Sequence, residues 1–391
     1  MSTPFYPSHD DPATLANWRT APYSQWAFHH VSDIVPSAVI KHSPKHMKPL
    51  PAGPDLKVPS FDFDGETYDL EQFLNATSTD GLVLLHKGRL VYETYRTGMT
   101  ASDQHILMSI SKSMLGLLAA ILTKEGRLDV NQDVLEYLPE LSNTGFAGAT
   151  IQQLLDMRCG VVFDEDYLAT EGAIIDYRKA TNWNPISSSE EPADLRSFFL
   201  TLNDPAAAHG GAMDYKSPCS DLLGWVIERI CQKRYADVFS ERVWSSIGAE
   251  YPAMITVDRL GAPRVAGGMS MTTRDLARVG QLLVDDGGGI IPKEWIEDIE
   301  QNGDRDAWQQ GSFAEFFKDL PMHYRSKWYC FLGDSPVLHC LGIHGQNLFV
   351  DRQEQLVMAK FASAREPLDT ANDLLSYAFY NKVKAQLATG N

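Results

Sequence analysis

The chain lacks the patterns that would tie it to a nucleic acid or a membrane. Its 391 residues include 34 basic and 51 acidic side chains, for a net charge of −17. This surplus of negative charge repels phosphate backbones and anionic lipid surfaces, so we expect neither as a partner. No apolar run approaches the roughly 20 residues of a membrane span, and residues 1–30 carry neither a basic start nor a hydrophobic signal core. These absences predict a soluble, cytoplasmic protein.

Cysteine is scarce and scattered. The five cysteines are Cys159, Cys219, Cys231, Cys330 and Cys340, with no Cys-x-x-Cys pair among them. Such an odd, dispersed set indicates neither a disulfide framework nor a zinc ribbon, so we expect reduced thiols packed in the core. The chain also has no Gly-x-Ser-x-Gly, Gly-x-x-x-x-Gly-Lys, Gly-x-Gly-x-x-Gly or His-Glu-x-x-His motif. We therefore expect no metal and no cofactor.

One short pattern does carry chemistry. Ser109-Ile110-Ser111-Lys112 is the single Ser-x-x-Lys of the chain, and it stands where an extended run gives way to a long apolar helix that stops near Gly126. A serine hydroxyl attacks a carbonyl at neutral pH only with a base in reach. Residues three apart lie on one helix face, so the Lys112 amine can reach Ser109. We predict Ser109 as nucleophile and Lys112 as general base; the alternative is a surface lysine on a first helical turn.

Two later segments offer further site residues, each with a structural alternative. Tyr215 stands directly before a predicted helix, so it is either a phenol that leans into a cleft or an aromatic at its rim. Residues 340–346 are expected to lie in a strand that contains two glycines, which indicates either a bulge or the close approach of a ligand or another backbone. A backbone N–H of this strand would supply one donor of an oxyanion hole, and the Ser109 N–H the other.

The arrangement of patterns along the chain is discontinuous. Strand-like runs lie near both ends, at 81–95 as a hairpin, at 338–350 and at 355–361, and a closing helix is expected at 369–387. The middle is mostly helical, with helices expected at 150–157, 194–202, 220–231 and 273–285. We expect the strands to share one sheet. This predicts an α/β domain from residues 1–108 and 270–391, a mostly helical domain at 109–269, and the active site at their junction.

Together these segments resemble the class C β-lactamase-like serine hydrolases, which have the penicillin-binding-protein-like fold. The order Ser-x-x-Lys, then Tyr-x-Ser or Tyr-x-Asn about a hundred residues later, then a glycine-containing strand is typical of that family. Within it, the chain most resembles the 6-aminohexanoate-dimer (nylon oligomer) hydrolases. The segments that carry the resemblance are 26–28, 35–38, 107–113, 155–157, 164–167, 255–258, 273–280 and 342–348. The resemblance implies an α/β (α+β) fold with an antiparallel sheet flanked by helices and a mostly helical inserted domain.

The resemblance also implies roles for single residues. Lys112 and Tyr215 would handle protons for Ser109, and the N–H groups of Ser109 and Ile343 would form the oxyanion hole. One aromatic residue would contact the leaving amide nitrogen and a second would gate the cleft; these are Tyr167 and Trp183. The expected substrate-binding residues are Tyr167, Trp183, Ser217, Gly342 and His344.

The chain departs from the family pattern at two places. Cys340 stands where β-lactamases and penicillin-binding proteins place the lysine of a Lys-Thr-Gly strand. The stretch 176–179, Asp-Tyr-Arg-Lys, is more basic than the acidic patch expected to hold the amino-terminal ammonium of a nylon oligomer. Both departures concern the substrate rather than the acyl-transfer chemistry.

The sequence therefore predicts a serine hydrolase that cleaves small linear amides or esters through an acyl-enzyme, like a 6-aminohexanoate-dimer hydrolase, with carboxylesterase activity. One alternative is D-amino-acid peptidase or β-lactamase-type activity, and another is an inactive binding protein on the same scaffold. The expected partner is a small amide or ester substrate. A homodimer is compatible with the sequence, which leaves the oligomeric state open.

Overall fold

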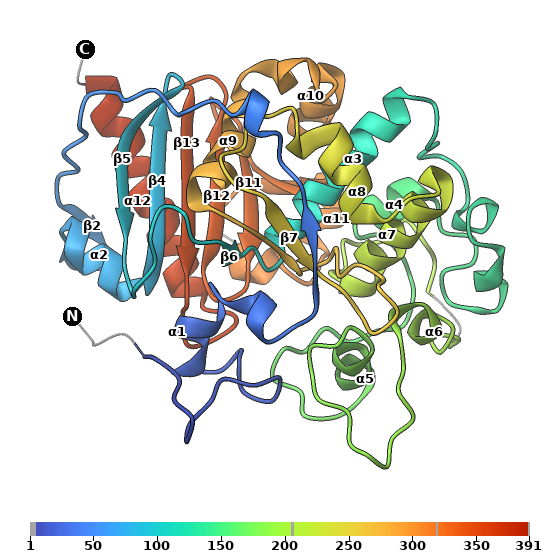
Figure 1. Cartoon of the computed structure of the whole chain (residues 1–391). Helices are drawn as coiled ribbons and strands as arrows, with labels where there is room; N and C mark the ends of the chain where they lie inside the picture. The colour runs from blue at the N-terminus through green and yellow to red at the C-terminus, as the bar shows by residue number, and fades with distance from the viewer. Residues whose placement is uncertain (1–4, 205–206, 318–319, 390–391) are drawn as a thin grey trace.

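The computed structural model describes residues 5–204, 207–317 and 320–389, and a seven-stranded sheet lies beside a region of helices (Figure 1). The sheet has the order β5-β4-β13-β12-β11-β10-β9, and all its neighbouring strands are antiparallel. Its strands are β4 (Thr79–His86), β5 (Arg89–Tyr95), β9 (Met322–Arg325), β10 (Trp328–Phe331), β11 (Val337–Gly342), β12 (Gln346–Asp351) and β13 (Leu356–Ala362). Because β4 pairs with β13, the prediction that strands from both ends share one sheet is confirmed.

The turns of this sheet correct one strand prediction. Lys87 and Gly88 both have positive φ, 51° and 72°, as a two-residue hairpin between β4 and β5 requires. The single strand expected at 338–350 is wrong, because β11 and β12 form a second hairpin. His344 and Gly345 make its turn at φ 64° and 88°. Polar residues, Gln346 and Asn347, follow the turn, and the apolar pattern of β12 resumes at Leu348.

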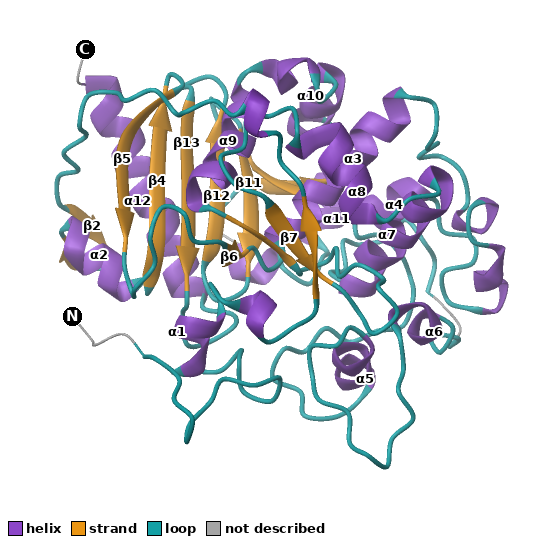
Figure 2. Cartoon of the chain, in the orientation of Figure 1, coloured by secondary structure: helices purple, strands orange, loops and turns teal. Residues whose placement is uncertain are grey.

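Helices cover both faces of the sheet (Figure 2). Adjacent residues of a strand point to opposite faces, and on β12 these are Leu348 and Phe349. Leu348 packs near Gly280 of α9 (Thr273–Val284), whereas the ring of Phe349 stacks on Tyr380 of α12 (Thr370–Thr389) at 5.0 Å. The closing helix expected near the end of the chain is confirmed as α12.

One helix runs through the centre of the molecule. Every residue of α3 (Ile110–Lys124) from position 110 to 122 is buried, and the helix packs against β11, β12 and α7 (Ser217–Cys231). A Cβ on Gly116 would lie 2.4 Å from the carbonyl oxygen of Ser326, so only glycine lets the helix lie this close to the β9–β10 turn. The start of α3 therefore lies where the sheet meets the helices.

A second sheet crosses the region predicted as mostly helical. It has the order β1-β7-β8-β6, with β1 (Ser37–Ile40), β6 (His105–Ile106), β7 (Ala253–Thr256) and β8 (Met269–Met271). β7 lies within residues 109–269 and pairs with β1, so that region is not purely helical. The division into two domains stays a prediction.

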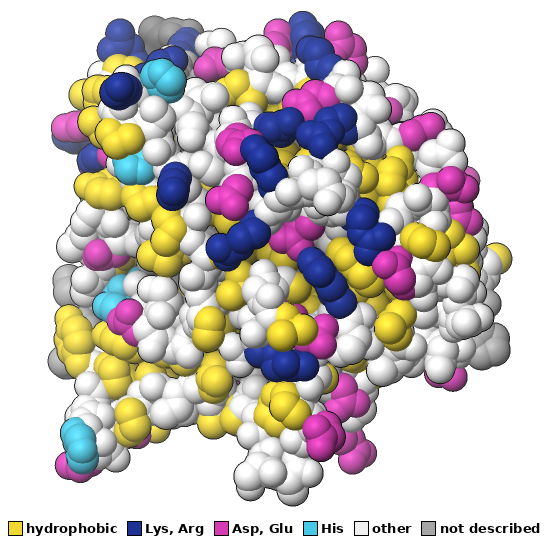
Figure 3. Space-filling model, turned by 45° about the vertical axis from the view of Figure 1, so that its right-hand side comes forward, with side chains coloured by type: hydrophobic (Ala, Val, Ile, Leu, Met, Phe, Trp, Pro, Cys, Tyr) yellow, Lys and Arg dark blue, Asp and Glu magenta, His cyan; other side chains and the backbone are white. Residues whose placement is uncertain are grey.

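The remaining helices are short. They are α1 (Tyr23–Ala27), α2 (Leu70–Ala76), α4 (Ile151–Leu155), α5 (Ala173–Ala180), α6 (Leu195–Phe199), α8 (Tyr235–Phe239), α10 (Lys293–Gln301) and α11 (Arg305–Gln309). Side-chain caps start two of those expected from the sequence, with Thr150 before α4 and Asp194 before α6. All five cysteines are free and buried, as predicted. Over the described ranges, none of the helices combines the length and apolar character that crossing a membrane would take. Lys and Arg side chains gather across the middle of one face, with Asp and Glu side chains among them (Figure 3).

Candidate active site

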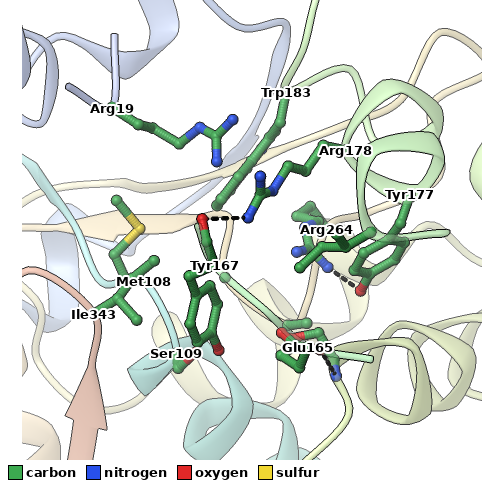
Figure 4. Close-up of a pocket in the computed structure, with 14 residues that line it drawn as sticks. Arg19, Met108, Ser109, Glu165, Tyr167, Tyr177, Arg178, Trp183, Arg264 and Ile343 are labelled. Carbon is green, nitrogen blue, oxygen red and sulfur yellow. Dashed lines mark hydrogen bonds between the residues drawn. The ribbon is translucent and has the colours of Figure 1, made fainter. Parts of the chain in front are cut away.

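Ser109 is the N-cap residue of α3 and follows a residue held in an unusual backbone conformation. Met108 has φ 47°, a left-handed value that costs free energy for a residue with a side chain. Its side chain is buried at 1 % exposure, and this packing holds the turn in place. Strain of this kind is concentrated at functional sites. The turn presents Ser109 at the floor of a cleft (Figure 4).

Lys112 lies within hydrogen-bond reach of Ser109, as its predicted role as general base requires. Its Nζ lies 2.9 Å from the Ser109 Oγ and donates a hydrogen bond to the carbonyl oxygen of Ala266 at 2.7 Å. The side chain is 1 % exposed, so it is not the surface lysine of the alternative interpretation. Burial lowers the pKa of the Lys112 amine to about 7, because an ammonium loses its hydration there. A substantial fraction of this amine is neutral at neutral pH.

Tyr215 lies beside both Ser109 and Lys112. Its ring centroid is 4.8 Å from the Lys112 Nζ, and its ring packs edge-on against Phe313 at 4.9 Å. Burial raises the pKa of the Tyr215 phenol, and the nearby Ser109 hydroxyl offsets part of that rise. Tyr215 is therefore a buried, protonated phenol beside Ser109 rather than a rim aromatic.

The end of β11 comes close to the segment before α3. A Cβ on Gly342 would lie 2.6 Å from the carbonyl oxygen of Leu107, so this glycine allows a backbone approach and is not a bulge within a strand. Ile343 follows and lines the cleft beside Ser109. Within the described part of the chain, neither the Ser109 N–H nor the Ile343 N–H donates to a backbone carbonyl. Both donors are available to a ligand.

The cleft has two parts that meet at Ser109, Tyr167 and Ile343, which line both. The first, called here the arginine pocket, is lined by Arg19, Glu165, Arg178, Trp183, Ser217 and Arg264. The second, called the aromatic pocket, is lined by Tyr215, Phe313, Tyr329, Leu341, Gly342 and Asp373. A bound molecule with a reacting centre at Ser109 could thus extend in two directions.

Four of the five expected substrate contacts line this cleft. Tyr167 stands between the two pockets, and Gly342 belongs to the aromatic pocket. Trp183 forms a wall of the arginine pocket at 4 % exposure, with its Nε1 donating to Thr256 Oγ1 at 3.0 Å. Ser217 donates to Glu165 from its N–H at 2.7 Å and from its hydroxyl at 2.5 Å.

His344 is placed differently. Its Nδ1 lies 2.8 Å from the carbonyl oxygen of Ala364, and its ring packs on Phe28. It lines a neighbouring hollow instead of the Ser109 cleft, and burial lowers its pKa to about 4. Cys340 faces Ser113 of α3, and burial raises the pKa of its thiol, so neither residue carries charge near Ser109 at neutral pH.

Several lining residues were not identified from the sequence. Glu165 could have been suspected from the acidic run at 164–166 directly before Tyr167. Arg264 left no local signal, because it enters the cleft through a buried ion pair with Asp221 and a hydrogen bond to Tyr177. Across the ranges that the structure describes, no three His, Cys, Asp or Glu side chains converge as metal ligands would.

The chain matches one known family. The family model for β-lactamase matches residues 70–379, and the chain belongs to that family. It is also a homologue of a particular hydrolase: it is 33 % identical over 358 residues to the 6-aminohexanoate-dimer hydrolase of Paenarthrobacter ureafaciens, covering 90 % of this chain and 89 % of the relative. The resemblance predicted from the sequence is confirmed.

Solved structures agree with the fold. A Bacillus anthracis protein provisionally named as a 6-aminohexanoate-dimer hydrolase superposes with a TM-score of 0.88 at 26 % identity, over 99 % of this chain and all of that one. EstCE1, described as a hydrolase with promiscuous acyltransferase activity, has a TM-score of 0.63 at 16 % identity, over 81 % and 98 % of the two chains. The predicted β-lactamase and penicillin-binding-protein-like fold is confirmed.

Proposed function

We propose that the protein is a serine hydrolase that cleaves small linear amides or esters through an acyl-enzyme on Ser109. The observation that carries this proposal is the buried Lys112 amine at 2.9 Å from the Ser109 Oγ. With its pKa lowered to about 7, that amine can accept the serine proton, which an ammonium cannot do. The homology to a 6-aminohexanoate-dimer hydrolase supports a linear amide as the substrate class.

The first half of the reaction forms the acyl-enzyme. Neutral Lys112 takes the hydroxyl proton as the Ser109 Oγ attacks the substrate carbonyl carbon. The carbonyl oxygen becomes an oxyanion, which the N–H groups of Ser109 and Ile343 stabilise. Collapse of this adduct breaks the bond to the amine or alkoxide, and Tyr215 gives that leaving group a proton. The Lys112 ammonium then reprotonates Tyr215, which leaves both groups as they began.

The second half releases the acid. A water molecule gives a proton to neutral Lys112 and attacks the Ser109 ester, and the same two N–H groups hold the second oxyanion. Collapse returns the proton to the Ser109 Oγ and frees the carboxylic acid. The raised pKa of Tyr215 favours a protonated phenol that donates, so Lys112 is the better candidate for the immediate base.

The two alternatives have less support. β-Lactams and D-amino-acid peptides carry a carboxylate that the related families bind with a strand lysine, whereas Cys340 is a buried, neutral thiol. A pure binding protein would have no use for a buried amine with a lowered pKa beside a serine on a strained turn. Both features are instead what a nucleophile needs.

The test is an activity screen over p-nitrophenyl esters, linear amide dimers, D-amino-acid amides and nitrocefin. We expect turnover of esters and linear amides that Ser109→Ala abolishes. The matched control is Ser111→Ala, which also removes one hydroxyl from α3, two residues after Ser109. The Ser111 hydroxyl accepts a hydrogen bond from the Met269 N–H. Turnover that survives in Ser109→Ala, or no turnover of any of the four classes, would contradict the proposal.

A further inference from the structure

Two guanidinium groups in the arginine pocket form no ion pair with any carboxylate of the described residues. Arg19 comes from the N-terminal segment and Arg178 from α5, and their guanidinium groups lie on either side of the Trp183 side chain (Figure 4). By contrast Arg264, the third arginine of the pocket, forms a buried ion pair with Asp221. Arg178 is buried and Arg19 is half-buried. Arginine is rarely buried without a partner, so the placement of these two residues needs an explanation.

The contacts of Arg178 are to neutral groups. Its guanidinium donates to the carbonyl oxygen of Tyr167 at 2.9 Å and of Ala169 at 3.4 Å. The residue is 8 % exposed, and burial is the main cause of the lowered pKa of its guanidinium. Carbonyl oxygens orient the guanidinium but do not neutralise it.

Arg19 is less satisfied still. It donates to the side-chain oxygen of Asn184, and its guanidinium carbon lies 5.6 Å and 5.7 Å from the ring centroids of Trp18 and Trp183. Its Nε is buried and has no hydrogen-bond partner in the described structure. Burial, followed by the nearby positive charge of Arg178, lowers the pKa of Arg19 to about 9.

The pocket holds too little negative charge for these two cations. Among the described residues that line it, Glu165 is the one carboxylate, and it accepts two hydrogen bonds from Ser217. Its negative charge opposes the effect of burial on the pKa of both Arg178 and Arg264, so one carboxylate is shared between two arginines. No carboxylate among the described residues forms an ion pair with Arg19 or Arg178. Two cations close together in a buried site repel each other, which costs free energy. A bound anion would offset this repulsion and would accept a charge-assisted hydrogen bond from each guanidinium.

The direction of the pocket decides which part of a substrate carries the anion. The leaving group must meet the proton donor Tyr215, which lines the aromatic pocket and not the arginine pocket. The acyl group then extends from Ser109 past Tyr167 toward Arg19 and Arg178. A 6-aminohexanoyl chain would bring an ammonium to these two cations. A group of the opposite charge, an anion, fits there instead.

We propose that Arg19 and Arg178 bind a carboxylate at the far end of the substrate's acyl group, so that the substrates are half-amides or half-esters of dicarboxylic acids. This inference rests on the proposed function, because it assigns the acyl side of the same cleft. Both arginines also line the hollow beside His344, so the carboxylate can reach them from the solvent side of the cleft.

The test compares three esters with the same leaving group: the mono-p-nitrophenyl ester of adipic acid, p-nitrophenyl hexanoate and p-nitrophenyl 6-aminohexanoate. A charge-assisted contact is worth about 1.5 to 3 kcal/mol, which is roughly 10- to 100-fold in kcat/KM. We expect the adipate ester to exceed the hexanoate ester by about that factor and the aminohexanoate ester to be the poorest. The ratio of adipate to hexanoate should fall about tenfold in Arg19→Met and in Arg178→Met.

Two further variants separate charge from structure. Arg178→Lys loses the two guanidinium hydrogen bonds to the carbonyl oxygens of Tyr167 and Ala169 but keeps the positive charge. It should therefore retain most of the adipate-to-hexanoate ratio. Arg234→Met makes the same change at an exposed arginine before α8 and should leave the ratio unaltered. An adipate ester no better than the hexanoate ester, or a ratio that survives in both Arg19→Met and Arg178→Met, would overturn the inference.

The result also separates this inference from the proposed function. Ser109-dependent turnover of the hexanoate ester with no preference for adipate would overturn the carboxylate subsite alone. Absence of turnover for all three esters, with no labelling of Ser109 by a fluorophosphonate, would overturn both.

Discussion

The Lys112 amine faces the Ser109 hydroxyl at 2.9 Å because both side chains project from the first turn of α3. The helix buries the lysine against the carbonyl oxygen of Ala266, so the amine has a polar contact but forms no ion pair with a carboxylate in the described part of the chain. This arrangement lowers the pKa of Lys112 without removing its access to the serine. The first three predictions follow from the proton transfer that it allows.

Lys112→Arg should be nearly inactive. A guanidinium has similar bulk but stays protonated at every pH that the protein tolerates, so it cannot accept the Ser109 proton. Loss of a general base costs roughly two to four powers of ten in rate. Steady-state hydrolysis of p-nitrophenyl butyrate measures this, with circular dichroism to confirm that the variant is folded. A folded Lys112→Arg that keeps most of its rate would remove Lys112 from the base role.

Activity should rise with pH through neutrality. The neutral Lys112 amine is the active form, and its pKa is lowered to about 7, so protonation below that pH switches the base off. For a neutral ester, kcat/KM should increase about tenfold per pH unit well below pH 7 and level off above it. A profile without any rise between pH 5.5 and 8 would show that no group with this pKa controls the reaction.

Tyr215→Phe should harm amide hydrolysis more than ester hydrolysis. An amine must be protonated as it leaves, whereas p-nitrophenolate leaves without a proton, and Tyr215 is a protonated phenol beside Ser109. We expect a loss of roughly two powers of ten or more on a linear amide and a much smaller loss on p-nitrophenyl butyrate. The control is Tyr324→Phe, which removes a hydroxyl from a buried neighbour of Tyr215 that does not line the cleft. Equal losses on the two substrates would contradict the donor role.

Esters should be far better substrates than β-lactams. Cys340 is wholly buried and neutral, so the strand offers no cation at the place where related families bind the β-lactam carboxylate. The missing charge-assisted contact corresponds to about one to two powers of ten in kcat/KM. The measurement compares p-nitrophenyl butyrate with nitrocefin on the unmodified protein. Nitrocefin turnover equal to or above that of the ester would mean that another group, with Arg178 the first candidate, takes the place of the lysine.

Gly116→Ala should destabilise the fold. The added Cβ would lie 2.4 Å from the backbone oxygen of Ser326, and backbone on both sides leaves little room to yield. Overpacking of this kind costs about 1 to 3 kcal/mol, which a thermal melt would detect as a lower Tm. Gly333→Ala is the control, because a Cβ there meets nothing within 4 Å. Equal melting temperatures for the two variants would show that α3 can shift away from the β9–β10 turn.

The sequence predicted the parts of the site that depend on local geometry. Ser109 and Lys112 share a helical turn, so their contact follows from spacing alone. The start of α7 was expected near Ser220 but lies at Ser217, because Pro218 sits in the first turn, where a missing N–H costs nothing. The sequence does not predict the β11–β12 turn, because the first of its two left-handed positions is occupied by His344 and not by a glycine.

The arginine pocket could not be assembled from the sequence. Arg19 and Arg178 are far apart along the chain and meet only because the N-terminal segment packs its Trp18 against Trp183. The sequence shows that residues 176–179 are basic. An anion site, however, also needs a second cation, and that cation comes from another segment. Contacts of this kind arise from tertiary packing, and no local pattern encodes them.

Covalent labelling tests the central claim most directly. The protein is treated with a fluorophosphonate in the presence and absence of p-nitrophenyl butyrate, digested and mapped by mass spectrometry. We predict one adduct per chain, located on Ser109, slowed by the ester and matched by a complete loss of turnover. An adduct on any other residue, or full turnover by the labelled protein, would contradict the assignment of Ser109 as the nucleophile.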